Sequence, residues 1–135
     1  MRCFVSSENI DQSPAKELIQ RLKEEGWIVD HSPRNPSEGK DPRWTDWYKS
    51  GLPTALDTSD VFIIVLNHVW DSSSWMSEEA HLAMESPTRR HVDHVFYWNP
   101  LDINVTAGGM LGYLRIELPH DLESLVAELR RVSAA

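Results

Sequence analysis

Two adjacent carboxylates, Glu78 and Glu79, follow a tryptophan in the stretch Ser-Ser-Trp-Met-Ser-Glu-Glu-Ala-His at residues 73–81. The spacing of the apolar residues predicts a helix over residues 76–86. Its inward stripe consists of Met76, Ala80, Ala83 and Met84. At about 100° per residue, Glu79 lies about 40° from Ala83, at the edge of this stripe, whereas Glu78 points into water. Of the two carboxylates, Glu79 is therefore the candidate for chemistry.

Trp75 lies one helical turn before Glu79, so the two side chains are neighbours on one flank of the helix. A carboxylate in a partly dry crevice can stabilise a developing positive charge. The alternative is that Glu79, an acidic residue in the first turn, complements the dipole of its helix. Trp75 likewise either borders a ligand or packs as an ordinary core residue. Geometry alone leaves both pairs of interpretations open.

Strand and helix signals alternate along the chain and must position these side chains. Apolar runs predict five short strands, at residues 2–6, 27–29, 61–66, 94–98 and 114–118. Helical spacing occupies most of the intervals, and Asp121 is expected to cap a last helix. Residues 61–66 are apolar on both faces, as in a central parallel strand. We expect an α/β fold: a three-layer, flavodoxin-like open sheet of about five parallel strands with helices on both faces.

In such a sheet, ligands bind outside the carboxyl ends of the strands. The first predicted strand ends in Ser6 and Ser7, the third is followed by Asn67, and the fourth ends in Trp98. Glu79 stands near the start of the helix after the third strand. These residues therefore outline the expected crevice.

The bulk numbers place limits on the function. A chain of 135 residues with 41% hydrophobic residues fits one domain, over residues 1–135. The formal charge of −8 argues against a nucleic-acid partner. One cysteine, Cys3, allows no disulfide framework, and we expect no metal site. No secretory leader or membrane-length apolar run is evident, so we expect a cytoplasmic protein without a membrane partner.

Four motifs together resemble a Toll/interleukin-1 receptor (TIR) domain of the small stand-alone prokaryotic kind. Phe4-Val5-Ser6-Ser7 resembles the first box of that family, and the proline-bearing loop at residues 31–43 stands at its BB loop. Residues 56–66 resemble the approach to its third strand. Trp75 and Glu79 stand at the W-x-x-x-E positions of its catalytic motif. The resemblance extends over roughly residues 1–130.

This resemblance implies cleavage of the nicotinamide–ribose bond of NAD+, by hydrolysis or cyclisation, with Glu79 as the catalytic residue. NAD+ would be the substrate, and no cofactor is expected. The implied substrate-binding residues are Phe4, Ser6, Ser7, Asn67, Trp75, Trp98, Arg34 and Arg43. Packing is the alternative role for Trp98. Arg34, Lys40 and Arg43 would either meet the pyrophosphate or have no specific partner.

Three functions are weighed. The first is a TIR-type NAD+ glycohydrolase in signalling or defence, self-associating through homotypic TIR contacts. The second is a non-catalytic TIR interaction module that acts by homotypic assembly. The third is an enzyme similar to nucleoside 2-deoxyribosyltransferases, which share the fold and use a glutamate against the sugar. Transfer between free nucleosides and bases, with NAD+ ignored, would distinguish the third.

Overall fold

The computed structural model describes residues 1–8, 10–32, 50–68, 74–85, 92, 94–105 and 111–134. The side chains of residues 74, 75, 85 and 111 lie outside this description. The elements, in chain order, are β1 (Arg2–Ser6), α1 (Ala15–Glu24), β2 (Ile28–Asp30), α3 (Leu52–Thr58), β3 (Val61–Val65), α4 (Ser74–Glu85), β4 (His94–Trp98), η4 (Leu111–Tyr113), β5 (Ile116–Glu117) and α5 (Leu122–Ala134).

The sheet has five strands in the order β2-β1-β3-β4-β5, and all neighbouring pairs are parallel. After β1 the chain adds β2 on one side and then β3 on the other. The strand order therefore reverses between β1 and β3, which is where flavodoxin-like sheets place their ligands. The predicted fold class is confirmed.

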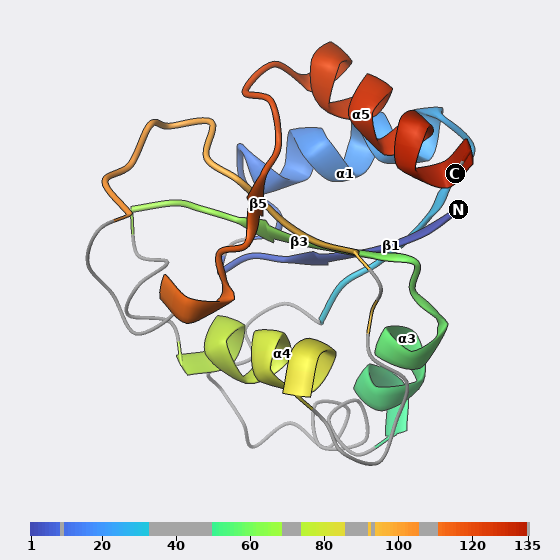
Figure 1. Cartoon of the computed structure of the whole chain (residues 1–135), viewed down its shortest axis with the longest axis vertical. Helices are drawn as coiled ribbons and strands as arrows, with labels where there is room; N and C mark the ends of the chain where they lie inside the picture. Colours follow the sequence, from blue (N-terminus) through green and yellow to red (C-terminus); the bar gives the residue numbers. More distant parts are fainter. Residues whose placement is uncertain are drawn as a thin grey trace.

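Helices cover both faces of the sheet (Figure 1). Helices α1 and α5 pack on one face, and α3 and α4 pack on the other. The central strand β3 is buried throughout, as the sequence predicted for a strand covered on both sides. Each face therefore encloses its own apolar cluster.

Alternation along β1 distributes its side chains between the two faces. Cys3 and Val5 belong to the cluster under α1 and α5, whereas Phe4 belongs to the cluster under α3 and α4. Burial raises the pKa of the Cys3 thiol to about 12. Ser6, two residues after Phe4, faces the α4 side. This register places a hydroxyl opposite the helix that carries Glu79.

The predicted element bounds mostly hold within two residues. Strands β1 and β4 have the predicted bounds, and β2 is shifted by one residue. The fifth strand is shorter than predicted, with only Ile116–Glu117 paired. Asp121 caps α5 as expected, since its Oδ2 accepts the backbone N–H of Ser124 at 2.8 Å.

Charged residues tie α1 to α5 across the outer surface of the molecule. Arg21 donates to both carboxylate oxygens of Glu123 and, at 3.0 Å, to Glu25 of its own helix end. Arg130 of α5 also donates to Glu25. The guanidinium of Arg130, and after it that of Arg21, lowers the pKa of Glu25 to about 2.

None of the helices in the described part of the chain is long and apolar enough to cross a bilayer. That residues 1–135 form a single domain stays a prediction.

Candidate functional site

Glu79 is buried inside the α4 layer, with a relative exposure of 1%. The helical wheel correctly placed Met76, Ala80 and Ala83 on the inward face, because all three are buried. The expectation of an edge position for Glu79 underestimated its burial. Glu78, expected in water, is half-buried, because a wheel drawn for an isolated helix omits the segments that pack around it.

Both carboxylate oxygens of Glu79 accept hydrogen bonds from serine hydroxyls. Ser6 Oγ donates to Oε1 at 2.8 Å. Ser32 Oγ donates to Oε2 at 2.5 Å. All three side chains are at least nine-tenths buried.

The three residues come from three elements that meet at one edge of the sheet. Ser6 is the last residue of β1, Ser32 follows the end of β2 at Asp30, and Glu79 lies in α4, which follows β3. Parallel strands end at a common edge, so these chain positions converge in space. The site lies at the β1 end beside β3, where the strand order reverses.

A buried carboxylate is costly unless hydrogen bonds replace its lost hydration. The hydroxyls of Ser6 and Ser32 supply two such bonds, and both donors are neutral. Together they restrain both oxygens of the carboxylate. A carboxylate held in this way can attack an electrophilic carbon or stabilise a developing cation.

The structure also describes three other residues expected at the site: Ser7, Asn67 and Phe4. Ser7 is buried directly after Ser6, and Asn67 is half-buried after β3. Phe4 lies on the Glu79 side of the sheet, stacked on Phe62 with ring centroids 5.6 Å apart. Its ring is fully buried and packs within the core, and contact with a substrate stays an untested prediction.

Four other expected residues are not placed. Arg34, Lys40 and Arg43 lie outside the described residues, and so does the side chain of Trp75. Their roles remain predictions.

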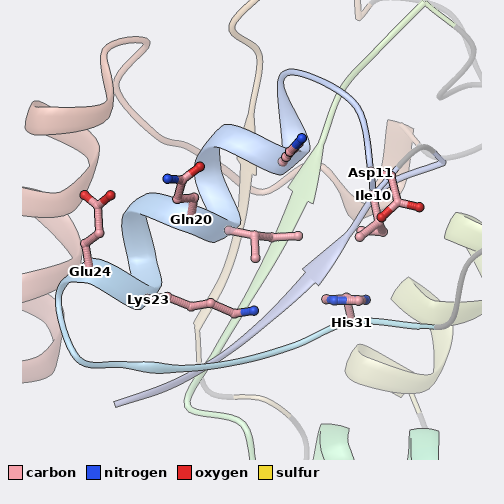
Figure 2. A pocket seen from close by; sticks show the side chains of 8 residues that line it. Ile10, Asp11, Gln20, Lys23, Glu24 and His31 are labelled. Carbon is pink, nitrogen blue, oxygen red and sulfur yellow. The ribbon is translucent and has the colours of Figure 1, made fainter.

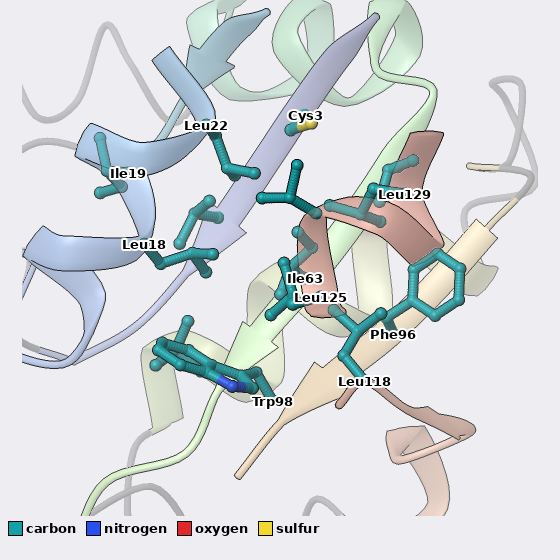
Figure 3. Close-up of a cluster of buried hydrophobic side chains, with 14 of the residues drawn as sticks. Cys3, Leu18, Ile19, Leu22, Ile63, Phe96, Trp98, Leu118, Leu125 and Leu129 are labelled. Carbon is teal, nitrogen blue, oxygen red and sulfur yellow. The ribbon is translucent and has the colours of Figure 1, made fainter. Parts of the chain in front are cut away.

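Trp98 is not brought to the site. Its ring packs in the cluster under α1 and α5, beside Leu118 and on the opposite face of the sheet from Glu79 (Figure 3). Its Nε1 donates to the carbonyl of His120 at 2.9 Å. The structure therefore places Trp98 in core packing on the face of the sheet opposite Glu79, and a role in substrate binding stays an untested prediction.

Ser32 is a site residue that the sequence reasoning did not single out. It was included only as part of the loop over residues 31–43. The rule that ligands meet the carboxyl ends of strands could have found it, because Ser32 follows β2 as Ser6 ends β1. No local periodicity distinguishes it.

A groove of about 510 Å³ lies along α1, beside the segment that follows β2 (Figure 2). Lys23 from α1 and His31 from the segment after β2 both extend into this space (Figure 2). Among the described residues, its lining consists of Ile10, Asp11, Lys16, Ile19, Gln20, Lys23, Glu24 and His31. Glu79 does not line it, although His31 is the immediate neighbour of Ser32.

Within the described residues, no three His, Cys, Asp or Glu side chains are grouped in a way that could hold a metal ion. The expectation that no cofactor is needed stays a prediction.

Comparison with known proteins gives a structural likeness only. No protein-family model matches the sequence, and no curated protein matches it. Among solved structures, the chain is similar to a 2-deoxyribosyltransferase from Bacillus psychrosaccharolyticus, with a TM-score of 0.57 and 13% sequence identity. The likeness covers 93% of this chain and 90% of that one. At this identity, it supports the fold.

The resemblance to TIR domains was wrong as a family assignment. No family model matches, and a solved structure that the chain resembles is a deoxyribosyltransferase. NAD+ as the substrate, homotypic TIR assembly, and a TIR role in signalling or defence are therefore withdrawn. The apolar residues of two of these motifs are core residues, so they indicate the fold and not the family. Phe4 and Phe62 fill one core, and Val5 fills the other, as any doubly wound sheet requires.

Proposed function

We propose that the protein transfers 2-deoxyribosyl groups between nucleobases, with Glu79 as the catalytic carboxylate. The observation that carries this proposal is the buried carboxylate of Glu79, held by two hydroxyls at the β1 end of the sheet. The likeness in fold to a 2-deoxyribosyltransferase, a protein described as a biocatalyst for nucleoside synthesis, supports the choice of substrate class.

In the first step, a carboxylate oxygen of Glu79 attacks C1′ of a 2′-deoxynucleoside, and the C1′–N bond breaks. The electron pair of that bond goes to the base nitrogen, and the base takes up a proton from water as it leaves, which the proton lost by the incoming base in the second step replaces. The transition state resembles an oxocarbenium ion, which the negative charge of the carboxylate stabilises. The product of this half-reaction is a 2-deoxyribosyl ester of Glu79.

In the second step, a ring nitrogen of another base attacks C1′ and the ester bond breaks. The bond electrons return to Glu79, and the incoming base loses its proton. The sum is an exchange of one base for another with no net redox change. Because the carboxylate is regenerated, the cycle needs no further reactant.

The depth of Glu79 sets a condition on this cycle. With 1% exposure the carboxylate is covered, so a bound nucleoside must displace part of that cover. The Ser6 and Ser32 hydroxyls lie next to the reacting oxygens. They are therefore placed to hold the carboxylate while the sugar is transferred.

The test is base exchange between thymidine and free adenine, followed by chromatography of the nucleosides. We expect wild-type protein to form 2′-deoxyadenosine and thymine in equal amounts. Glu79→Ala should lower the initial rate by about a thousandfold or more, as is usual when a nucleophile is removed. Glu78→Gln, one residue away and half-buried, is the matched control and should retain the rate.

Absence of exchange by well-folded wild-type protein would refute the proposal. Exchange that survives Glu79→Ala would refute the role of this carboxylate. Release of thymine without formation of 2′-deoxyadenosine, even in excess adenine, would show that the reaction is hydrolysis and not transfer.

A further inference from the structure

Both the side chain and the main chain of Ser32 make hydrogen bonds. Its side-chain Oγ donates to Glu79 Oε2 at 2.5 Å, and its main-chain carbonyl lies 2.9 Å from Nδ1 of His31. A carbonyl oxygen only accepts, so Nδ1 of His31 carries the proton in this bond. The residue is 4% exposed. Its hydroxyl therefore has a defined position from which to bond the carboxylate.

The partners of Glu79 are also arranged to fix its orientation. Ser6 and Ser32 bond different oxygens of the same carboxylate, and they reach it from sequence positions 73 and 47 residues away. Each bond restrains one oxygen of the carboxylate. Two bonds from separate strand ends therefore restrict its rotation.

We propose that Ser32, together with Ser6, is a positioning residue that holds the Glu79 carboxylate in its reactive orientation. This inference rests on the proposed transfer reaction, in which an oxygen of Glu79 must approach C1′ along a defined line. Reacting atoms must be aligned at about 3–3.5 Å, and a misplacement of about 1 Å can reduce the rate about a hundredfold. A held carboxylate reaches this alignment in each turnover, whereas a rotating one does so in few.

The experiment compares Ser32→Ala, Ser32→Thr and Ser59→Ala in the thymidine–adenine exchange. Ser59 is the matched control because it is a fully buried serine whose Oγ donates to the Ala55 carbonyl, away from Glu79. We expect Ser32→Ala to lower kcat about tenfold to a hundredfold with little change in KM. Ser32→Thr keeps a hydroxyl on the same carbon and should restore part of kcat, and Ser59→Ala should leave kcat unchanged.

A second measurement checks the carboxylate directly. In protein labelled with ¹³C at the glutamate carboxyl carbons, the Glu79 signal is identified by its loss in Glu79→Gln. Ser32→Ala should shift or broaden that signal, and Ser59→Ala should not.

The outcomes separate this inference from the reaction on which it rests. Undiminished kcat or an unmoved Glu79 signal in folded Ser32→Ala overturns the positioning role while wild-type exchange still stands. Equal losses of kcat in Ser32→Ala and Ser59→Ala assign the effect to general destabilisation and also overturn it. No exchange by wild type overturns both the reaction and the positioning role.

Discussion

Ser6 Oγ donates a hydrogen bond to Glu79 Oε1 at 2.8 Å, although the two residues are 73 positions apart. The bond joins the end of β1 to the inner face of α4. It supplies one of the contacts that a buried carboxylate needs in place of water.

The first prediction concerns this bond. Ser6→Ala leaves a buried charged acceptor without that donor, so we expect a loss of about 1.5–3 kcal/mol in the free energy of unfolding. Urea unfolding followed by fluorescence measures it. In a double-mutant cycle, Glu79→Gln should reduce the cost of Ser6→Ala, because the two residues share the interaction.

Ser13 provides the control for that cycle. Its Oγ also donates to a glutamate, Glu17 Oε1, at 2.9 Å, but this pair is exposed. Ser13→Ala should change the unfolding free energy by no more than about 0.5 kcal/mol. Similar losses for Ser6→Ala and Ser13→Ala would contradict the importance of burial at Ser6.

The second prediction separates Trp98 from the site. Trp98→Phe removes the bond from Nε1 to the His120 carbonyl and leaves a small void in the cluster under α1 and α5. We expect about 1–3 kcal/mol of destabilisation, with unchanged KM for thymidine in the exchange assay. A raised KM for thymidine in a variant that remains folded would indicate that Trp98 takes part in substrate binding.

The third prediction concerns acid stability and the ion pairs between α1 and α5. The pKa of Glu25 is about 2 in the folded protein because of Arg130 and then Arg21, and it is higher in the unfolded chain, where these contacts are lost. The stabilisation is therefore present above the ordinary carboxyl pKa and is lost as the pH falls toward about 2.

Thermal unfolding of wild type and Glu25→Gln between neutral and acidic pH measures this effect. We expect wild type to have the higher Tm near neutrality, and the two Tm values to converge in acid. Added salt near 1 M should also narrow the difference, since the Debye length falls to about 3 Å. A Tm difference that grows as the pH falls would contradict the stabilisation of the folded protein by ionised Glu25.

The elements could be predicted from sequence because their signals are local. Strand β4 is a run of aromatic and β-branched residues, and the buried stripe of α4 repeats at helical spacing. The same helical wheel selected Glu79 over Glu78. Ser32 was missed because no local periodicity marks it and the rule on strand ends was applied only to the first, third and fourth predicted strands.

The face occupied by Trp98 depended on strand register, which the sequence did not supply. Ser6 pairs with Ile64 and Ile64 with Tyr97, so Tyr97 shares the face of Ser6. Trp98, the next residue, points to the other face. Proximity to a strand end predicted the correct edge of the sheet but not the correct side.

The convergence of Ser6, Ser32 and Glu79 has a consequence for folding. A fragment must contain the whole of residues 6–79 to include all three side chains. They come together only when β1 has paired with both of its neighbours, β2 and β3. Contacts this distant in sequence form late and slowly in parallel sheets. The proposed exchange activity should therefore recover only after β1 has paired with β2 and β3, which would make activity a sensitive reporter of complete folding.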